Sequence, residues 1–117
     1  MSCPMHRVTH LQEPADFEAA VEESRRRPVL LFKHSRNCGV SCEALDELQA
    51  HVERTDGTAV YKVVTVQSHR TVSDHMATRL GIRHETPQAI LLRDGRPVWS
   101  ASHFRITADA LSEHIDG

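Results

Sequence analysis

The sequence predicts an α/β fold in which a mixed central sheet of four to five strands is flanked by helices. Two apolar runs, at residues 29–32 and 59–66, have the composition of buried strands, and segments of helical periodicity lie around them. Near the end of the chain, Asp94-Gly95 separates two further strand-like segments and favours a tight hairpin. The expected order of elements is β-α-β-α-β-α-β-β-α, with parallel crossovers first and an antiparallel pair later.

The chain is expected to begin with a short strand and a helix. Residues 8–11 suit a strand, and Pro14 suits the first turn of the helix, where its missing N–H costs nothing. The apolar side of this helix is formed by Phe17, Ala20 and Val21. Pro28 ends the helix because the residue before a proline avoids the α region, so the three arginines at 25–27 form its solvated end.

Two helices are expected in the middle of the chain. The first runs from Gly39 to about residue 54, and the second covers residues 73–80 and is ended by Gly81. The apolar side of the first is formed by Val40, Ala44, Leu45, Leu48 and Val52.

The remaining elements are a hairpin and a final helix. Strands are expected at residues 88–92 and 97–101, and Thr107 is placed to cap the helix that follows. The buried side of that helix is formed by Ala110, Leu111 and Ile115.

Length and charge exclude several classes of function. The 117 residues suit one domain over 1–117, with residues 1–7 as a flexible arm. Fourteen basic and sixteen acidic residues leave a net charge of −2, and aromatic residues are scarce at 4%, so we expect no nucleic-acid partner. No apolar run is long enough to span a bilayer, and the first residues do not resemble a secretory signal. We therefore expect a cytoplasmic protein without a membrane partner.

Cys38 is the candidate nucleophile, because it stands where the first long strand hands over to a helix. The unpaired N–H groups and positive dipole of a helix start stabilise a thiolate and lower its pKa. A free thiol of pKa about 8.5 is only about 3% ionised at pH 7, so this stabilisation decides its reactivity. Lys33, His34 and Arg36, just upstream, can add positive potential. The alternative is that Cys38 is a small buried hydrophobic residue.

Cys42 is a candidate partner for Cys38. In a Cys-x-x-Cys pair the second thiol would stand at position 41, but this chain has Ser41 there and the thiol one residue later. Ser41 lies near the middle of the apolar stripe of its helix and Cys42 lies well off it. Cys42 is therefore either a resolving thiol that requires the first turn to unwind or a partly exposed bystander. A zinc site built from Cys3, His6 and these two cysteines has the wrong spacing, and we expect no metal.

Three segments together resemble a known family. They are residues 32–41 (FKHSRNCGVS), 84–89 (HETPQA) and 99–107 (WSASHFRIT). They resemble the monothiol bacilliredoxins, small thioredoxin-like proteins of the bacterial cytosol. The resemblance implies a thioredoxin-like fold and a thiol–disulfide oxidoreductase that removes bacillithiol, or a similar small thiol, from proteins carrying it as a mixed disulfide. Cys38 would be the nucleophile, and the small thiol would be a co-substrate with no other cofactor.

The resemblance also implies substrate-binding residues. Thr86 and Pro87 match the cis-proline loop of this fold, and Asn37 and Gly39 flank the nucleophile. Ser102 and His103 match the loop before the last helix. Lys33, Arg36 or Arg83 could bind the carboxylates of the small thiol, with solvated surface charge as the alternative for each.

The chain departs from the family at two positions. Gly39 replaces the proline that usually follows the reactive cysteine, and glycine loosens a helix start. Cys42 is an addition to the monothiol motif. Two other functions stay open at this point: a redox-sensing binding module without turnover, and a zinc-binding protein.

Overall fold

The computed structural model describes residues 8–36, 39–55 and 57–116, so predictions made for the N-terminal arm, for Cys3 and His6, for Asn37 and for Cys38 lie outside it. The elements follow one another as β1 (Val8–His10), α1 (Pro14–Glu23), β2 (Val29–His34), α2 (Gly39–Arg54), β3 (Val60–Thr65), α3 (Arg70–Leu80), β4 (Gln88–Arg93), β5 (Arg96–Ser102), a 3₁₀ turn η1 (His103–Arg105) and α4 (Ala108–Asp116). The predicted order is confirmed, and η1 is the one addition to it.

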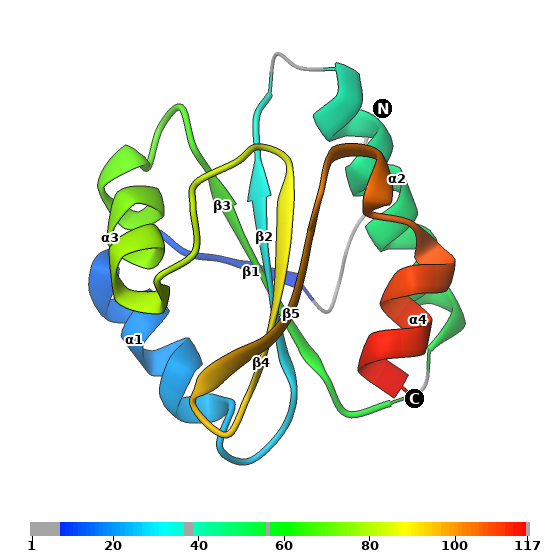
Figure 1. Ribbon diagram of the computed structural model, residues 1–117, viewed down its shortest axis with the longest axis horizontal. Helices are drawn as coiled ribbons and strands as arrows, with labels where there is room; N and C mark the ends of the chain where they lie inside the picture. Colours follow the sequence, from blue (N-terminus) through cyan, green and yellow to red (C-terminus); the bar gives the residue numbers. More distant parts are fainter. Residues whose placement is uncertain (1–7, 37–38, 56, 117) are drawn as a thin grey trace.

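The strands form a five-stranded mixed sheet in the order β1-β3-β2-β4-β5. β1 and β2 both pair with β3 in parallel, whereas β4 runs antiparallel to β2 and to β5. The sheet is therefore parallel in its first half and antiparallel in its second, as predicted. Both faces are covered, with α1 and α3 on one side and α2 and α4 on the other (Figure 1).

The core lies in two layers on either side of β2. Leu30 and Phe32 belong to the apolar cluster beneath α2 and α4, whereas Val29 and Leu31 belong to the cluster beneath α1 and α3. This alternation follows from the period of two in a strand. All four side chains are fully buried, so the continuous apolar run reflects a strand covered on both faces.

Local signals in the sequence mark the element ends. Pro14 occupies the first turn of α1, and Gly81 ends α3 with a φ of 68°. Asp94 and Gly95 form the hairpin turn with φ values of 55° and 80°, and Thr107 Oγ1 accepts the Ala110 N–H at 3.0 Å as the predicted cap of α4.

Tertiary contacts correct three of the predicted details. Helix α1 ends at Glu23, because the carbonyl and the hydroxyl of buried Ser24 accept the N–H groups of Asp94 and Gly95 at 2.8 Å each; the three arginines lie in the turn beyond. Helix α3 begins at Arg70, three residues early, and its added first turn includes Val72, which is buried one turn before Met76. In α4 Ala108 is buried and Ala110 only half-buried.

Within the described part of the chain, no helix combines the length and the apolar character needed to cross a membrane.

Candidate functional site

The candidate site lies at one end of the sheet, where β2 finishes and β4 starts. The last pair of residues in the register between these strands is Lys33 and Gln88. The turn that leads from β2 to α2 and the loop that precedes β4 therefore meet at the same edge. The nucleophile predicted from the sequence, Cys38, belongs to that turn but lies outside the described residues, as does Asn37.

The described half of the turn is held by hydrogen bonds from two sides. The Ser35 N–H donates to Ser41 Oγ at 2.9 Å, which joins the turn to the start of α2. Gln67, after β3, donates from Nε2 to Ser35 Oγ at 2.7 Å and accepts the Arg36 N–H at Oε1 at 3.2 Å. The backbone on the strand side of Cys38 is thus anchored to both neighbouring segments.

The first turn of α2 separates a buried serine from an exposed cysteine. Ser41 is fully buried, and its Oγ also lies 2.9 Å from Nδ1 of His34. Cys42 is exposed, so the prediction that it stands off the buried stripe is confirmed, whereas its role as a resolving thiol stays a prediction. Gly39 is the first residue of α2, and a Cβ placed there would have no neighbour within 4 Å.

The charges upstream of the turn differ from those expected. His34 is half-buried, and burial, followed by the charges of Arg36 and His10, lowers its pKa and favours the neutral ring. Arg36 and Arg83 are exposed, as their predicted surface positions require.

The prediction that Lys33 lies on the surface is wrong, because the residue is 0% exposed. The sequence placed it in a polar turn, but β2 extends to His34 and carries the lysine into the layer beneath α3. Its Nζ donates to the Ser73 carbonyl at 3.2 Å and to His84 Nδ1 at 3.1 Å. Burial lowers the pKa of Lys33 to about 8, and the nearby charge of Asp74 opposes this shift. Lys33 is therefore not a surface residue that could bind a carboxylate of the small thiol.

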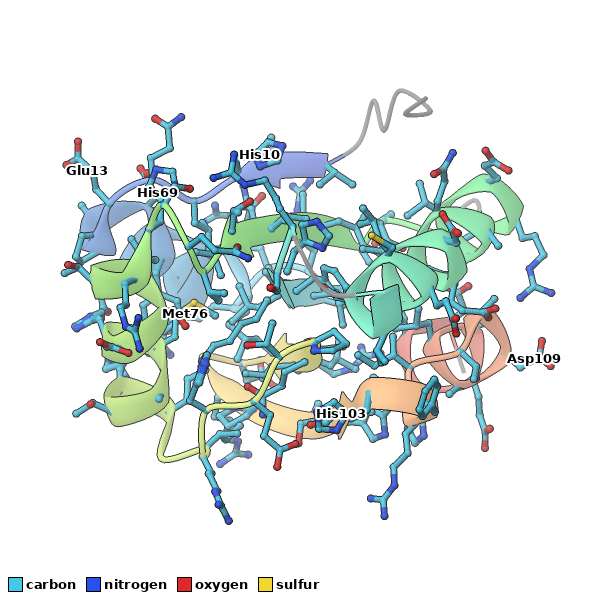
Figure 2. All side chains as sticks on the ribbon, turned by 90° about the horizontal axis from the view of Figure 1, so that it is seen from above. His10, Glu13, His69, Met76, His103 and Asp109 are labelled. Carbon is cyan, nitrogen blue, oxygen red and sulfur yellow. The ribbon has the colours of Figure 1, made fainter. Side chains whose placement is uncertain are left out.

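The loop before β4 brings Thr86, Pro87 and His103 together. The Thr86–Pro87 peptide bond is cis. The Pro87 carbonyl accepts the N–H of His103 at 3.1 Å, and Gln88 pairs with Ser102 across the sheet. Figure 2 shows His103 beyond the end of β5, on the opposite side of the molecule from β1.

A cavity of about 470 Å³ opens beside this loop. It is lined by Glu85, Ser100, Ala101, Ser102, His103, Phe104 and Arg105. The pKa of Glu85 is lowered by a hydrogen bond from the Ser102 side chain and by the charges of His103, Arg83 and Arg105. Phe104, at the rim of this cavity, is 71% exposed.

Sequence reasoning found part of this edge and missed the rest. It identified Thr86, Pro87, Ser102 and His103, which the structure places side by side. It missed His84 and Glu85, because a single histidine and a single glutamate in a loop carry no spacing signal. Among residues 8–36, 39–55 and 57–116, no three histidine, cysteine, aspartate or glutamate side chains gather in a way that could hold a metal ion.

The chain is similar to known proteins over most of its length. The family described as monothiol bacilliredoxin BrxC matches residues 9–111. One similar solved structure is a protein with a thioredoxin fold to which an oxidoreductase activity has been ascribed. It shares 30% sequence identity, covers 92% of each chain and superposes with a TM-score of 0.81.

More distant structures share the fold alone. A thioredoxin variant from Halobacterium salinarum is 20% identical, with a TM-score of 0.73 and coverage of 99% of this chain and 94% of the other. Thioredoxin f from spinach chloroplast is 21% identical, with a TM-score of 0.71 and coverage of 99% and 96%. The five-stranded sheet with helices on both faces is a thioredoxin fold.

Proposed function

Because the chain belongs to the monothiol bacilliredoxin family and is a thiol–disulfide oxidoreductase of the thioredoxin type, we propose that it removes a small thiol from mixed disulfides on other proteins. We propose bacillithiol as the small thiol and Cys38 as the nucleophile. The observation that carries this proposal is the family match over residues 9–111, which includes the turn that contains Cys38 and the cis-proline loop.

The proposed reaction is an exchange of disulfides without net oxidation. The Cys38 thiolate attacks the sulfur of the small thiol in the mixed disulfide. A disulfide between Cys38 and the small thiol forms, the bond to the target protein breaks, and the target cysteine leaves as a thiolate that takes up a proton. A second molecule of the small thiol then attacks the adduct, which regenerates Cys38 and releases the oxidised dimer of the small thiol.

The electrostatics around the start of α2 support a reactive thiolate. Helix α2 is 16 residues long and begins directly after Cys38 in the sequence, with no acidic residue in its first turn. Its positive end therefore favours an anion there, and no carboxylate in that turn opposes it. The hydrogen bonds of Ser35 and Arg36 hold the preceding backbone in place.

The cis-proline loop and η1 supply a surface for the substrate. Thr86, Pro87 and His103 lie together at the edge of the sheet to which the β2–α2 turn also belongs. We propose that the extended backbone of the target protein binds along Thr86 and Pro87, with His103 beside it. Asn37 and Gly39 would contact the substrate from the other side of the proposed nucleophile.

Cys42 offers a second way to clear the adduct. Its thiolate would attack the Cys38 sulfur, release the small thiol and leave a disulfide between Cys38 and Cys42, which an external dithiol reductant then reduces. Cys42 is exposed on the first turn of α2, and the glycine at the helix start makes the necessary unwinding less costly.

The test is a turnover assay on a model protein that carries a single cysteine capped with bacillithiol or, in parallel, with glutathione. Cys38→Ser should abolish release of either cap, and Cys42→Ser is the matched control that should leave the first exchange intact. Mass spectrometry of the wild type then identifies the adduct on Cys38 and any internal disulfide. Full activity of Cys38→Ser would refute the assignment of the nucleophile. A single exchange without turnover, in the presence of excess small thiol, would indicate a redox-sensing binding module instead.

A further inference from the structure

Buried Lys33 contacts His84, an exposed residue of the loop that precedes the cis proline, and the proposed reaction does not yet use this contact. Lys33 stands on the face of β2 toward α1 and α3, whereas its neighbour His34 contacts Ser41 of α2 on the other face. The ammonium group of Lys33 is fully enclosed, and His84 lies over it from the loop. Lys33 therefore does not touch the substrate directly, and its hydrogen bond to His84 links it to the loop.

The hydrogen bonds fix the protonation state of His84. An ammonium group has only donors, so at the 3.1 Å contact Lys33 Nζ donates and His84 Nδ1 must accept. Nδ1 therefore carries no proton, and the neutral ring carries its proton on Nε2. Burial and the charge of Lys33 both lower the pKa of His84, which agrees with a neutral ring.

The same tautomer sets the direction of the Thr86 hydroxyl. His84 Nε2 lies 3.2 Å from Thr86 Oγ1, and since Nε2 carries the proton, it donates and the hydroxyl oxygen accepts. The hydroxyl proton of Thr86 is then left to donate to a different acceptor. In the Nδ1-protonated tautomer the direction of this hydrogen bond would reverse. The unprotonated Nε2 would accept from the Thr86 hydroxyl, which could then not donate to a different acceptor.

We propose that Lys33 is a positioning residue that, by holding His84 in the Nε2-protonated tautomer, keeps the Thr86 hydroxyl available as a hydrogen-bond donor to the bound mixed disulfide or to its peptide backbone. The inference rests on the proposed function, because it assigns the substrate contact of Thr86 in that reaction. Gln88, whose Nε2 donates to the Arg83 carbonyl at 3.0 Å, ties the other end of the same loop.

Ser73 is the competing explanation for the orientation of His84. Its Oγ lies 3.2 Å from the same Nδ1 atom, and its hydroxyl could also donate there. The two explanations predict that different substitutions change the tautomer of His84. If Lys33 sets the tautomer, Ser73→Ala leaves it unchanged and Lys33→Met disturbs it.

The first test determines the tautomer of His84 directly and needs no activity measurement. Long-range ¹H–¹⁵N correlation spectra of the folded protein distinguish a protonated from an unprotonated ring nitrogen, and the signals of His84 are assigned by their loss in His84→Gln. We expect an Nε2-protonated ring in the wild type and in Ser73→Ala. In Lys33→Met we expect an increased population of the Nδ1-protonated ring and a raised pKa of His84, because the neighbouring positive charge is gone. The remaining charges around His84 are those of Asp74, Glu85 and Arg70, and they are common to all variants.

The second test connects the tautomer to the substrate. With the capped model protein, Lys33→Met should raise KM about two- to tenfold, the cost of one misdirected hydrogen bond, and leave kcat nearly unchanged. The same substitution in a Thr86→Val background should raise KM less than about twofold, because the hydroxyl it positions is absent.

Three results would overturn the inference: an unchanged tautomer and pKa of His84 in Lys33→Met, loss of the tautomer in Ser73→Ala, or equal effects of Lys33→Met on KM with and without Thr86. These results are independent of the outcome for Cys38→Ser. A failed assignment of Cys38 would leave the spectra of His84 as predicted, and a failed role of Lys33 would leave the proposed exchange intact.

Discussion

The buried ammonium group of Lys33 predicts that the protein becomes more stable as the pH rises through the alkaline range. Its pKa is lowered by burial from 10.5 to about 8 in the folded protein. Below about pH 8 the lysine is charged in both the folded and the unfolded state, and the folded state carries the cost of enclosing that charge. Between about pH 8 and 10.5 the folded protein has released the proton and the unfolded chain still holds it, so the free energy of unfolding increases with pH.

The size of this effect follows from the difference between the two pKa values. A difference of about 2.5 at about 1.4 kcal/mol for each tenfold change gives a total of about 3 kcal/mol, of which about 2 kcal/mol is recovered between about pH 7 and about pH 9.5. Lys33→Met fills a similar volume without the charge and should lack the increase.

Denaturant unfolding of both proteins at the two pH values measures the effect. The free energy of unfolding of the wild type, minus that of Lys33→Met, should rise by about 2 kcal/mol from about pH 7 to about pH 9.5. Taking this difference removes the contributions of titrating groups that both proteins share. The control is the other lysine of the chain, Lys62, which is partly exposed and lies 3.8 Å from Glu23. Lys62→Met retains Lys33, so it should keep the increase in stability that Lys33→Met lacks. A difference between wild type and Lys33→Met that stays constant, or that falls with pH, would refute the reasoning.

Four further substitutions test the fold, each by denaturant unfolding at neutral pH. Gly39→Ala should stabilise the protein by up to about 1 kcal/mol, because a Cβ there meets nothing within 4 Å. Gly81→Ala is equally unobstructed, but Gly81 has a φ of 68°, so this substitution should destabilise the protein by about 1–2 kcal/mol. A change of the same sign for both would contradict the argument from φ. Ser41→Ala should cost about 1–3 kcal/mol, because the Ser35 N–H and His34 lose a buried partner, and a neutral result would show that water replaces it. Leu48→Ala, at a fully buried position of α2, should cost about 2–5 kcal/mol, and a smaller loss would mean that the core beneath α2 collapses around the cavity.

Much of the fold was predictable because its signals are local. The run VLLF at 29–32 indicates a strand covered on both faces, and Pro14, Gly81 and Asp94-Gly95 mark a helix start, a helix end and a hairpin turn. Each of these signals depends on backbone geometry or on side-chain period within a few residues, so it does not depend on how the chain folds elsewhere. The separation of buried Ser41 from exposed Cys42 was predictable for the same reason, since it follows from the helical period alone.

The end of α1 was not predictable, because it depends on a distant segment. Pro28 is a correct stop signal in the sequence, but the helix finishes earlier, where Ser24 accepts hydrogen bonds from Asp94 and Gly95. A local reading cannot anticipate a partner about seventy residues away.

By itself, the sequence determined the order and type of the elements, the position of the proposed nucleophile at a strand-to-helix junction, and the family through the three segments that contain FKHSRNCGVS, HETPQA and WSASHFRIT. Only the tertiary structure decided that Lys33 is enclosed, that His84 covers it, and that Thr86, Pro87 and His103 meet at one edge of the sheet. The reason is physical: secondary structure follows from the period and the conformational preferences of neighbouring residues, whereas the burial of a charge depends on which distant strand and helix close over it. A lysine after an apolar run looks the same in a sequence whether the strand stops before it or carries it inside.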